Sequence, residues 1–162
     1  DGLTEQHNLE KIKTIGDAYM VVGGVPMPRH DHAQAIAKRC CKQIANMALD
    51  MQQEVANLNA KHHTTLTVRI GINTGPVVAG VIGTKKFIYD LWGDAVNTAS
   101  RMESHGVAGY IQVSESTYQY LQASYQLKSR GIIQVKGKGE MMTYLLKGKK
   151  VDVTEKLNKI AN

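Results

Sequence analysis

The sequence predicts an α+β domain with a ferredoxin-like, palm-like core, in which an antiparallel or mixed sheet carries flanking helices. Short alternating apolar runs, several of them in hairpins, are typical of strands, and they interleave with segments of helical periodicity. Their order, strand–helix–strand with an added hairpin and a second helix–strand unit, is typical of that core. The 162 residues, 43% of them hydrophobic, are enough for one domain with its own core.

The N-terminal part predicts a helix end followed by a hairpin. Residues 1–8 have one apolar position among polar ones, as in the last turns of a helix. Alternating apolar residues predict strands over 9–15 and 18–23, and the Gly16-Asp17 pair between them predicts a tight turn. A glycine- and proline-rich loop follows.

The clearest helix is predicted over residues 30–58. Its apolar residues recur at spacings of three and four, which gives one stripe that faces a core; they are Ala33, Ile36, Ala37, Cys40, Ile44, Met47, Met51, Val55 and Leu58. Cys40 and Cys41 are adjacent in this helix. Because adjacent cysteines make no secreted disulfide framework, we expect a reducing, cytoplasmic compartment.

The second half predicts more strands and two shorter helices. Strands are expected over 66–73, 87–91, 110–113, 127–135 and 142–146, the last two as an antiparallel pair. One helix is expected to begin with Asp94 as its cap and to end near residue 104, and another to run from Ser114 to about residue 121. Glycines around 77–82 indicate close backbone contact. We therefore expect the domain over 1–147 and a polar tail over 148–162.

The charge and apolar patterns exclude several classes. A formal charge of +6 suits a polyanionic ligand, although much of it lies in scattered lysines. No apolar run approaches the roughly 18–20 residues of a membrane span, so a soluble domain is expected, whose parent protein could still be membrane-anchored. One Phe, one Trp and no aromatic run count against a nucleic-acid partner.

Several polar residues could carry chemistry. Asp17 could bind Mg²⁺ with substrate phosphates, or only cap its own turn. Asn97 and Arg101 lie four apart, so they share one helix face and could bind one ligand; alternatively, Arg101 contacts Glu103 or Asp94 on a solvated face.

Four charged residues lie in or beside strands and turns. Lys136 belongs to a Lys-Gly-Lys-Gly turn that could approach phosphates, and Arg69 lies in a predicted strand, where an arginine usually faces solvent. Lys13 and Asp90 could bind the edge of a purine or could be exposed strand charges. The glycine spacing matches neither a P-loop nor a Rossmann motif.

Three long motifs give a family resemblance. The runs Glu10–Gly24, Arg69–Gly83 and Tyr89–Ser104 resemble the class III nucleotidyl cyclase catalytic domain, and Gly131–Gly139 fits the same family near its end. The resemblance covers residues 3–147, with the motifs in the order of the family.

The resemblance implies an adenylyl cyclase, a phosphorus–oxygen lyase that converts ATP to 3′,5′-cyclic AMP and pyrophosphate in intracellular signal transduction. Asp17 matches the second of two metal-binding aspartates, which implies two Mg²⁺ or Mn²⁺ ions per site. Lys13 and Asp90 match the pair that recognises adenine, where guanylyl cyclases typically carry Glu and Cys.

The remaining matches concern the sugar and the phosphates. Asn97 and Arg101 match the residues that orient the ribose and stabilise the transition state. Lys136 and Arg69 match contacts to the triphosphate. Two alternatives stay open: a guanylyl cyclase, or a catalytically silent module for nucleotide binding or dimerisation. The joint presence of Asp17, Asn97 and Arg101 argues against the silent module.

The resemblance also implies a head-to-tail homodimer. One subunit would supply the metal aspartates and Arg69, and the other subunit the remaining site residues. The family's first strand, with the first metal aspartate, should lie some tens of residues before Lys13, which only twelve residues precede. We therefore expect a chain that is truncated at its N-terminus and has little activity alone, and upstream regulatory domains in the parent protein.

Overall fold

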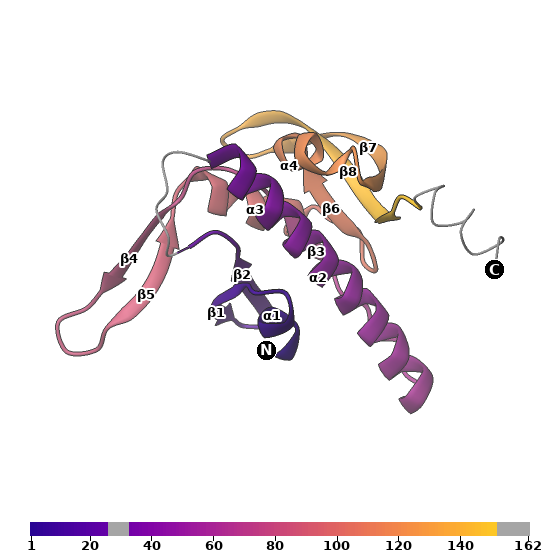
Figure 1. The fold of residues 1–162 in the computed structure, drawn as a ribbon, viewed down its shortest axis with the longest axis horizontal. Coiled ribbons are helices and arrows are strands. Elements are labelled where there is room, and N and C mark those ends of the chain that lie inside the picture. The colour runs from indigo at the N-terminus through magenta and orange to yellow at the C-terminus, as the bar shows by residue number, and fades with distance from the viewer. Residues whose placement is uncertain (26–32, 152–162) are drawn as a thin grey trace, which may run out of the picture.

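A computed structural model describes residues 1–25 and 33–151 (Figure 1). Strands and helices interleave along the chain. The helices are α1 (Gly2–Gln6), α2 (Ala33–His62), α3 (Asp94–Ser104) and α4 (Glu115–Leu121). The strands are β1 (Glu10–Ile15), β2 (Ala18–Val22), β3 (Ile70–Ile72), β4 (Val78–Ile82), β5 (Ile88–Trp92), β6 (Ile111–Ser114), β7 (Tyr125–Val135) and β8 (Gly139–Lys149).

The main sheet is mixed, as the sequence predicts. Its four strands run in the order β3-β6-β8-β7. Strand β3 pairs in parallel with β6, and the other neighbours are antiparallel. All four residues of β6 are buried, because this strand lies inside the sheet and is covered on both faces.

The core lies between this sheet and helices α2 and α4. Its buried residues are Cys41, Ala45, Ala48, Ile72, Ile111, Val113, Leu121, Tyr125 and Leu146. Side chains alternate along a strand, so Gln112 points away from this core, toward α3 on the opposite face. Sheet and helices therefore form three layers, and the prediction of a mixed sheet with flanking helices is confirmed.

The apolar stripe of α2 differs in part from the predicted one. Ala45 and Ala48, which the predicted stripe omits, are almost fully buried, whereas Leu58 is 44% exposed. Small residues let the helix approach the sheet closely, and the last turns of α2 extend beyond the sheet (Figure 1). The helix ends at His62, four residues later than predicted, and its expected start at residue 30 lies outside the described residues.

Two hairpins form small sheets of their own. Strand β1 pairs with β2, and the turn between them uses Gly16 at φ +59°. Strands β4 and β5 form an arm that projects from the body (Figure 1). Gly83 at its tip has φ +127°, and a Cβ there would lie 1.9 Å from the Lys86 carbonyl oxygen, so the turn requires glycine.

Other boundaries also differ from the predictions. The strand expected over 66–73 is only the three residues of β3. Gly93, not Asp94, is the N-cap of α3, and Asp94 is the first helical residue. Strand β8 continues to Lys149, and residues 152–162 of the predicted tail lie outside the described residues. Among the described helices, none is both long and apolar enough to span a membrane.

Candidate functional site

Lys13 and Asp90 form an ion pair between the two hairpins. The ammonium of Lys13 on β1 donates to Oδ2 of Asp90 on β5 at 2.6 Å, across 77 residues of sequence. The register of β1 shifts between Lys11 and Lys13, and such a bulge redirects side chains. The two side chains therefore contact each other, and their predicted role at the edge of a purine stays a prediction.

The Asp90 carboxylate is held at both oxygens. Oδ1 accepts the backbone N–H of Leu91 at 2.8 Å, and the side chain is only 15% exposed. The hydrogen bond from Lys13, and then that from Leu91, lower the pKa of Asp90 below its ordinary value. The pair therefore presents one donor and one charged acceptor side by side, which complements a ligand edge with one acceptor and one donor.

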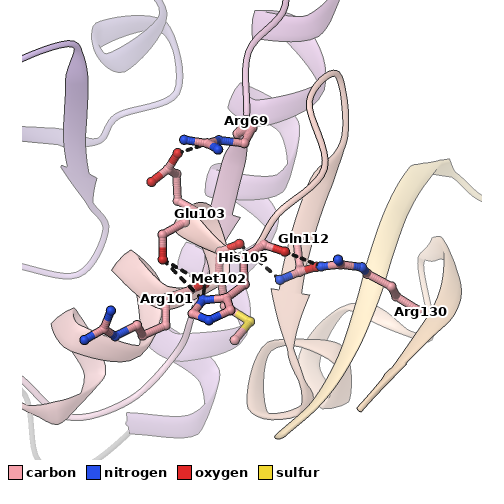
Figure 2. A network of polar contacts seen from close by, with 8 residues as sticks. Arg69, Arg101, Met102, Glu103, His105, Gln112 and Arg130 are labelled. Carbon is pink, nitrogen blue, oxygen red and sulfur yellow. Dashed lines mark hydrogen bonds and ion pairs between the residues drawn. The ribbon is translucent and has the colours of Figure 1, made fainter. Parts of the chain in front are cut away.

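Asn97 and Arg101 lie one turn apart on α3, as predicted, and both are exposed. Among the described residues, nothing bonds to the side chain of either one. In Figure 2 the Arg101 guanidinium points away from the other labelled side chains. The predicted alternative partners are used elsewhere, since Glu103 pairs with Arg69 and Asp94 pairs with Lys138.

Arg69 lies just before β3 and contacts α3. Its Nε donates to Glu103 Oε1 at 3.0 Å, and both side chains are partly exposed. This contact leaves the two terminal nitrogens of the guanidinium available. The predicted role of Arg69 at a triphosphate stays a prediction.

Asp17 lies in the β1–β2 turn, exposed and without a hydrogen bond or ion pair to any described residue. Within residues 1–25 and 33–151, no three His, Cys, Asp or Glu side chains converge on a metal position. Mg²⁺ commonly binds through one or two carboxylates together with substrate phosphates. The Asp17 carboxylate, which no described residue bonds, fits a metal ion that is bound by protein and substrate together. The described residues do not fit a metal site whose ligands all come from the protein.

The β7–β8 turn carries Lys136 and Lys138. Lys136 is exposed, whereas Lys138 forms an ion pair with Asp94 in the first turn of α3. Gly137 and Gly139 have φ of +83° and +77°, which explains the alternation of lysine and glycine. The Lys138–Asp94 pair fixes this turn beside α3.

The side chains that hold α3 at its two ends could not be identified from the residue patterns. Near its start, Asn73 Nδ2 donates to the Ala95 carbonyl at 2.9 Å, and Asn73 Oδ1 accepts from Ser114 at 2.6 Å. Near its end, Gln112 and Arg130 bind backbone carbonyls (Figure 2). These polar residues have no motif of their own, and only the spatial approach of distant segments reveals them.

The comparisons with known proteins assign the family. Residues 1–148 match the adenylate and guanylate cyclase catalytic domain, and the chain belongs to this family, which confirms the resemblance. Members of this family bind nucleotides and use divalent metal ions.

Three relatives illustrate the family. An adenylate cyclase of Mycobacterium tuberculosis is 52% identical over 151 residues, which are 93% of this chain and 32% of that protein. The guanylate cyclase domain of RhGC from Catenaria anguillulae, solved in complex with GTP, has a TM-score of 0.80 and 38% identity over 93% of this chain and 78% of that one.

The third relative is a non-canonical dimeric guanylyl cyclase domain from Blastocladiella emersonii. It has a TM-score of 0.73 and 35% identity over 93% of this chain and 78% of that one. The chain thus spans most of the solved domains but about a third of the length of the mycobacterial protein.

Proposed function

We propose that this chain is the catalytic domain of an adenylyl cyclase, which converts ATP to 3′,5′-cyclic AMP and pyrophosphate. The observation that carries the proposal is the Lys13–Asp90 pair. Adenine offers a ring-nitrogen acceptor beside an amino donor, and the ammonium and carboxylate offer the complementary donor and acceptor. Guanine presents the opposite pattern on that edge. The 52% identity to a mycobacterial adenylate cyclase supports the same substrate.

The exposed face of α3 would bind the reacting part of ATP. Asn97 would orient the ribose through its amide. Arg101, one turn later, would stabilise the negative charge that grows on the α-phosphate. Lys136 and the free terminal nitrogens of Arg69 would bind the triphosphate.

The reaction is an internal displacement at phosphorus. The ribose 3′-oxygen forms a bond to the α-phosphorus while the bond from that phosphorus to the oxygen bridging to the β-phosphate breaks. The 3′-hydroxyl gives its proton to solvent water, and pyrophosphate leaves. Asp17 would hold Mg²⁺ or Mn²⁺, two ions per site, which when bound favour loss of that proton and neutralise the pyrophosphate.

The projecting arm supports a homodimer. Four of its apolar side chains, Val78, Val81, Phe87 and Ile88, are 56–75% exposed. By the strand register, Val78 and Ile88 lie on one face of this two-stranded ribbon and Val81 lies on the other. Exposed apolar surface of this extent marks sites of protein–protein interaction. In the head-to-tail pair, one copy would supply Asp17 and Arg69, and the other copy would supply the remaining residues. The free thiols of Cys40 and Cys41 fit a reducing, cytoplasmic compartment.

The test is turnover of ATP and GTP by the purified full-length native protein with Mg²⁺ or Mn²⁺. We expect ATP to be preferred. The double variant Lys13→Glu with Asp90→Cys reverses the donor and acceptor positions, so its preference should shift toward GTP. Lys11→Glu is the matched control, because Lys11 is on the same strand but pairs with Asp1.

The second candidate is a guanylyl cyclase, which the similarity to the Catenaria domain favours. A native preference for GTP would support it and contradict the adenylyl assignment. An unchanged ATP preference in the double variant would contradict the role of the Lys13–Asp90 pair. Nucleotide binding without any cyclic product would identify a silent module instead.

A further inference from the structure

Helix α3 carries the two side chains that we assign to the reacting centre, yet neither is held by its own contacts. Asn97 and Arg101 are exposed, and among the described residues no partner bonds to them. Their positions therefore depend on how α3 itself is fixed to the sheet. The inference below rests on the proposed function, because it concerns the placement of these residues.

Close packing sets the distance between α3 and the sheet. A Cβ on Gly71 of β3 would lie 2.1 Å from the backbone nitrogen of Glu103 and 2.7 Å from the carbonyl oxygen of Ala99. The backbones therefore touch on both sides of Arg101 in the sequence. Packing against Gly71 fixes the separation of helix and sheet, but a residue without a side chain offers no hydrogen bond that would oppose sliding of the C-terminal turn along the helix axis.

A buried amide opposes such sliding. Gln112 on β6 is fully buried between two apolar residues of the same strand, and its Nε2 donates to the carbonyl of Met102 at 3.1 Å. The last carbonyls of a helix lack partners within the helix. An unsatisfied buried amide is costly, so Gln112 and the last turn of α3 stabilise each other.

Arg130 completes this contact from a third element (Figure 2). It is the bulged residue of β7, between Ser129 and Gly131, and its Nη1 donates to Gln112 Oε1 and to the carbonyl of His105. Because Oε1 accepts from Arg130, the amide must turn its Nε2 toward Met102. A cation at a helix C-terminus is also favoured by the helix dipole.

We propose that Gln112 and Arg130 are positioning residues for this reaction, and that they fix the axial position of α3 and thereby the place of Arg101. The two carbonyls that they bind lie one and four residues after Arg101, which spans one helical turn. They touch no substrate and act only through the helix. Arg69, which lies just before β3 and is bound to Glu103, supports the same turn.

The first test is the kinetics of Arg130→Met in the full-length native protein. Loss of the anchor should lower kcat for ATP by about 10- to 100-fold, since displacement by 1 Å can cost that much, with KM changed less than about threefold. Arg130→Lys should recover part of the loss. Lys128→Met, which removes a charge from the same strand away from α3, is the control and should leave kcat unchanged.

The decisive comparison uses an Arg101→Ala background. If the anchor acts through Arg101, Arg130→Met should add little further loss once Arg101 is absent. An equal loss in both backgrounds would overturn the inference. Gln112→Met is the second variant, and its effect should not add to that of Arg130→Met, because both break one network.

A measurement without turnover separates this inference from the proposed function. Amide hydrogen exchange over residues 97–105 should become about tenfold faster in Arg130→Met and Gln112→Met, while exchange in α2 stays unchanged. Unchanged exchange in both variants would overturn the inference even in an active enzyme. Faster exchange in a protein that makes no cyclic nucleotide would support the anchor and contradict the proposed function.

Discussion

The two halves of the candidate site are held in place by opposite means. Lys13 and Asp90 hold each other directly, at 2.6 Å, although they belong to different hairpins. Asn97 and Arg101 have no partner among the described residues and are held only through the backbone of α3. The comparison teaches that two residues that recognise a ligand can be pre-organised by their own charges. A residue that must stabilise a growing charge instead keeps its side chain unbonded, and the contacts that support it are made to the backbone of its helix.

The strongest test of this difference is Arg101→Ala. We expect a loss of about 10²- to 10³-fold in kcat, the usual effect of removing one donor that stabilises a transition state. The melting temperature should change little, because the exposed guanidinium bonds to no described residue. A kcat within about threefold of the parent enzyme would contradict its role at the phosphate.

Mixing experiments sharpen the same test. In a head-to-tail pair, Asp17→Asn and Arg101→Ala each disable both sites, but a mixed dimer keeps one intact site. Random pairing should therefore recover about a quarter of the parent activity. No recovery, with both variants folded, would contradict the division of the site between two copies.

Gly71→Ala should break the support behind Arg101. The new methyl group would meet the backbone of Glu103 at 2.1 Å, so α3 must move away from β3. Overpacking of this kind costs about 1–3 kcal/mol of unfolding free energy. Thermal or urea unfolding measures it, and Gly148→Ala is the control, because no atom of the described residues lies within 4 Å of a Cβ built there.

The smallest expected effect concerns the pH dependence of the Lys13–Asp90 pair. Hydrogen bonds from Lys13 and Leu91 lower the pKa of Asp90 in the folded chain. Its contribution to stability is therefore present above the ordinary aspartate value of about 3.9 and is lost as the pH falls through the lower folded value. Between pH 5 and 8, roughly, this group adds no pH dependence.

Asp90→Asn tests this assignment. In a plot of melting temperature against pH, the parent chain loses stability at acid pH. Below about pH 4 this loss should be less steep in the variant. Asp50→Asn is the control variant for removal of a carboxylate, since Asp50 also has one side-chain partner, His7. An acid limb identical to that of the parent chain would contradict the lowered pKa.

The sequence was sufficient for local structure but not for contacts between distant segments. Alternation and turn residues predicted the β1–β2 hairpin and the antiparallel β7–β8 pair, since register and turn chemistry are local properties. Strand β4 was missed, because the glycines around residues 77–82 were interpreted only as a sign of close backbone contact. The length of β3 was overestimated, because residues 66–69 alternate like a strand but have no partner strand in the described chain. The cap of α3 was missed because Gly93, at φ +133°, performs it without a side chain.

The candidate site was predictable only as separate motifs. The local alternatives for Arg101 failed for a geometric reason: Glu103, two residues on, faces another side of the helix, and Asp94 is two turns away. Gln112 resembles any polar residue within a strand, and nothing in its neighbours shows that it faces α3. The Lys13–Asp90 contact depends on two hairpins meeting, which residue patterns do not specify.

The exposed apolar side chains of the β4–β5 arm have a consequence for how the reaction rate depends on the concentration of the chain. If each site needs two copies of the chain, the rate at high dilution grows with the square of the chain concentration. Cyclic nucleotide output would then remain low until enough molecules meet. Any neighbouring segment that holds two copies together, or keeps them apart, would control the output without touching a single residue that contacts the nucleotide.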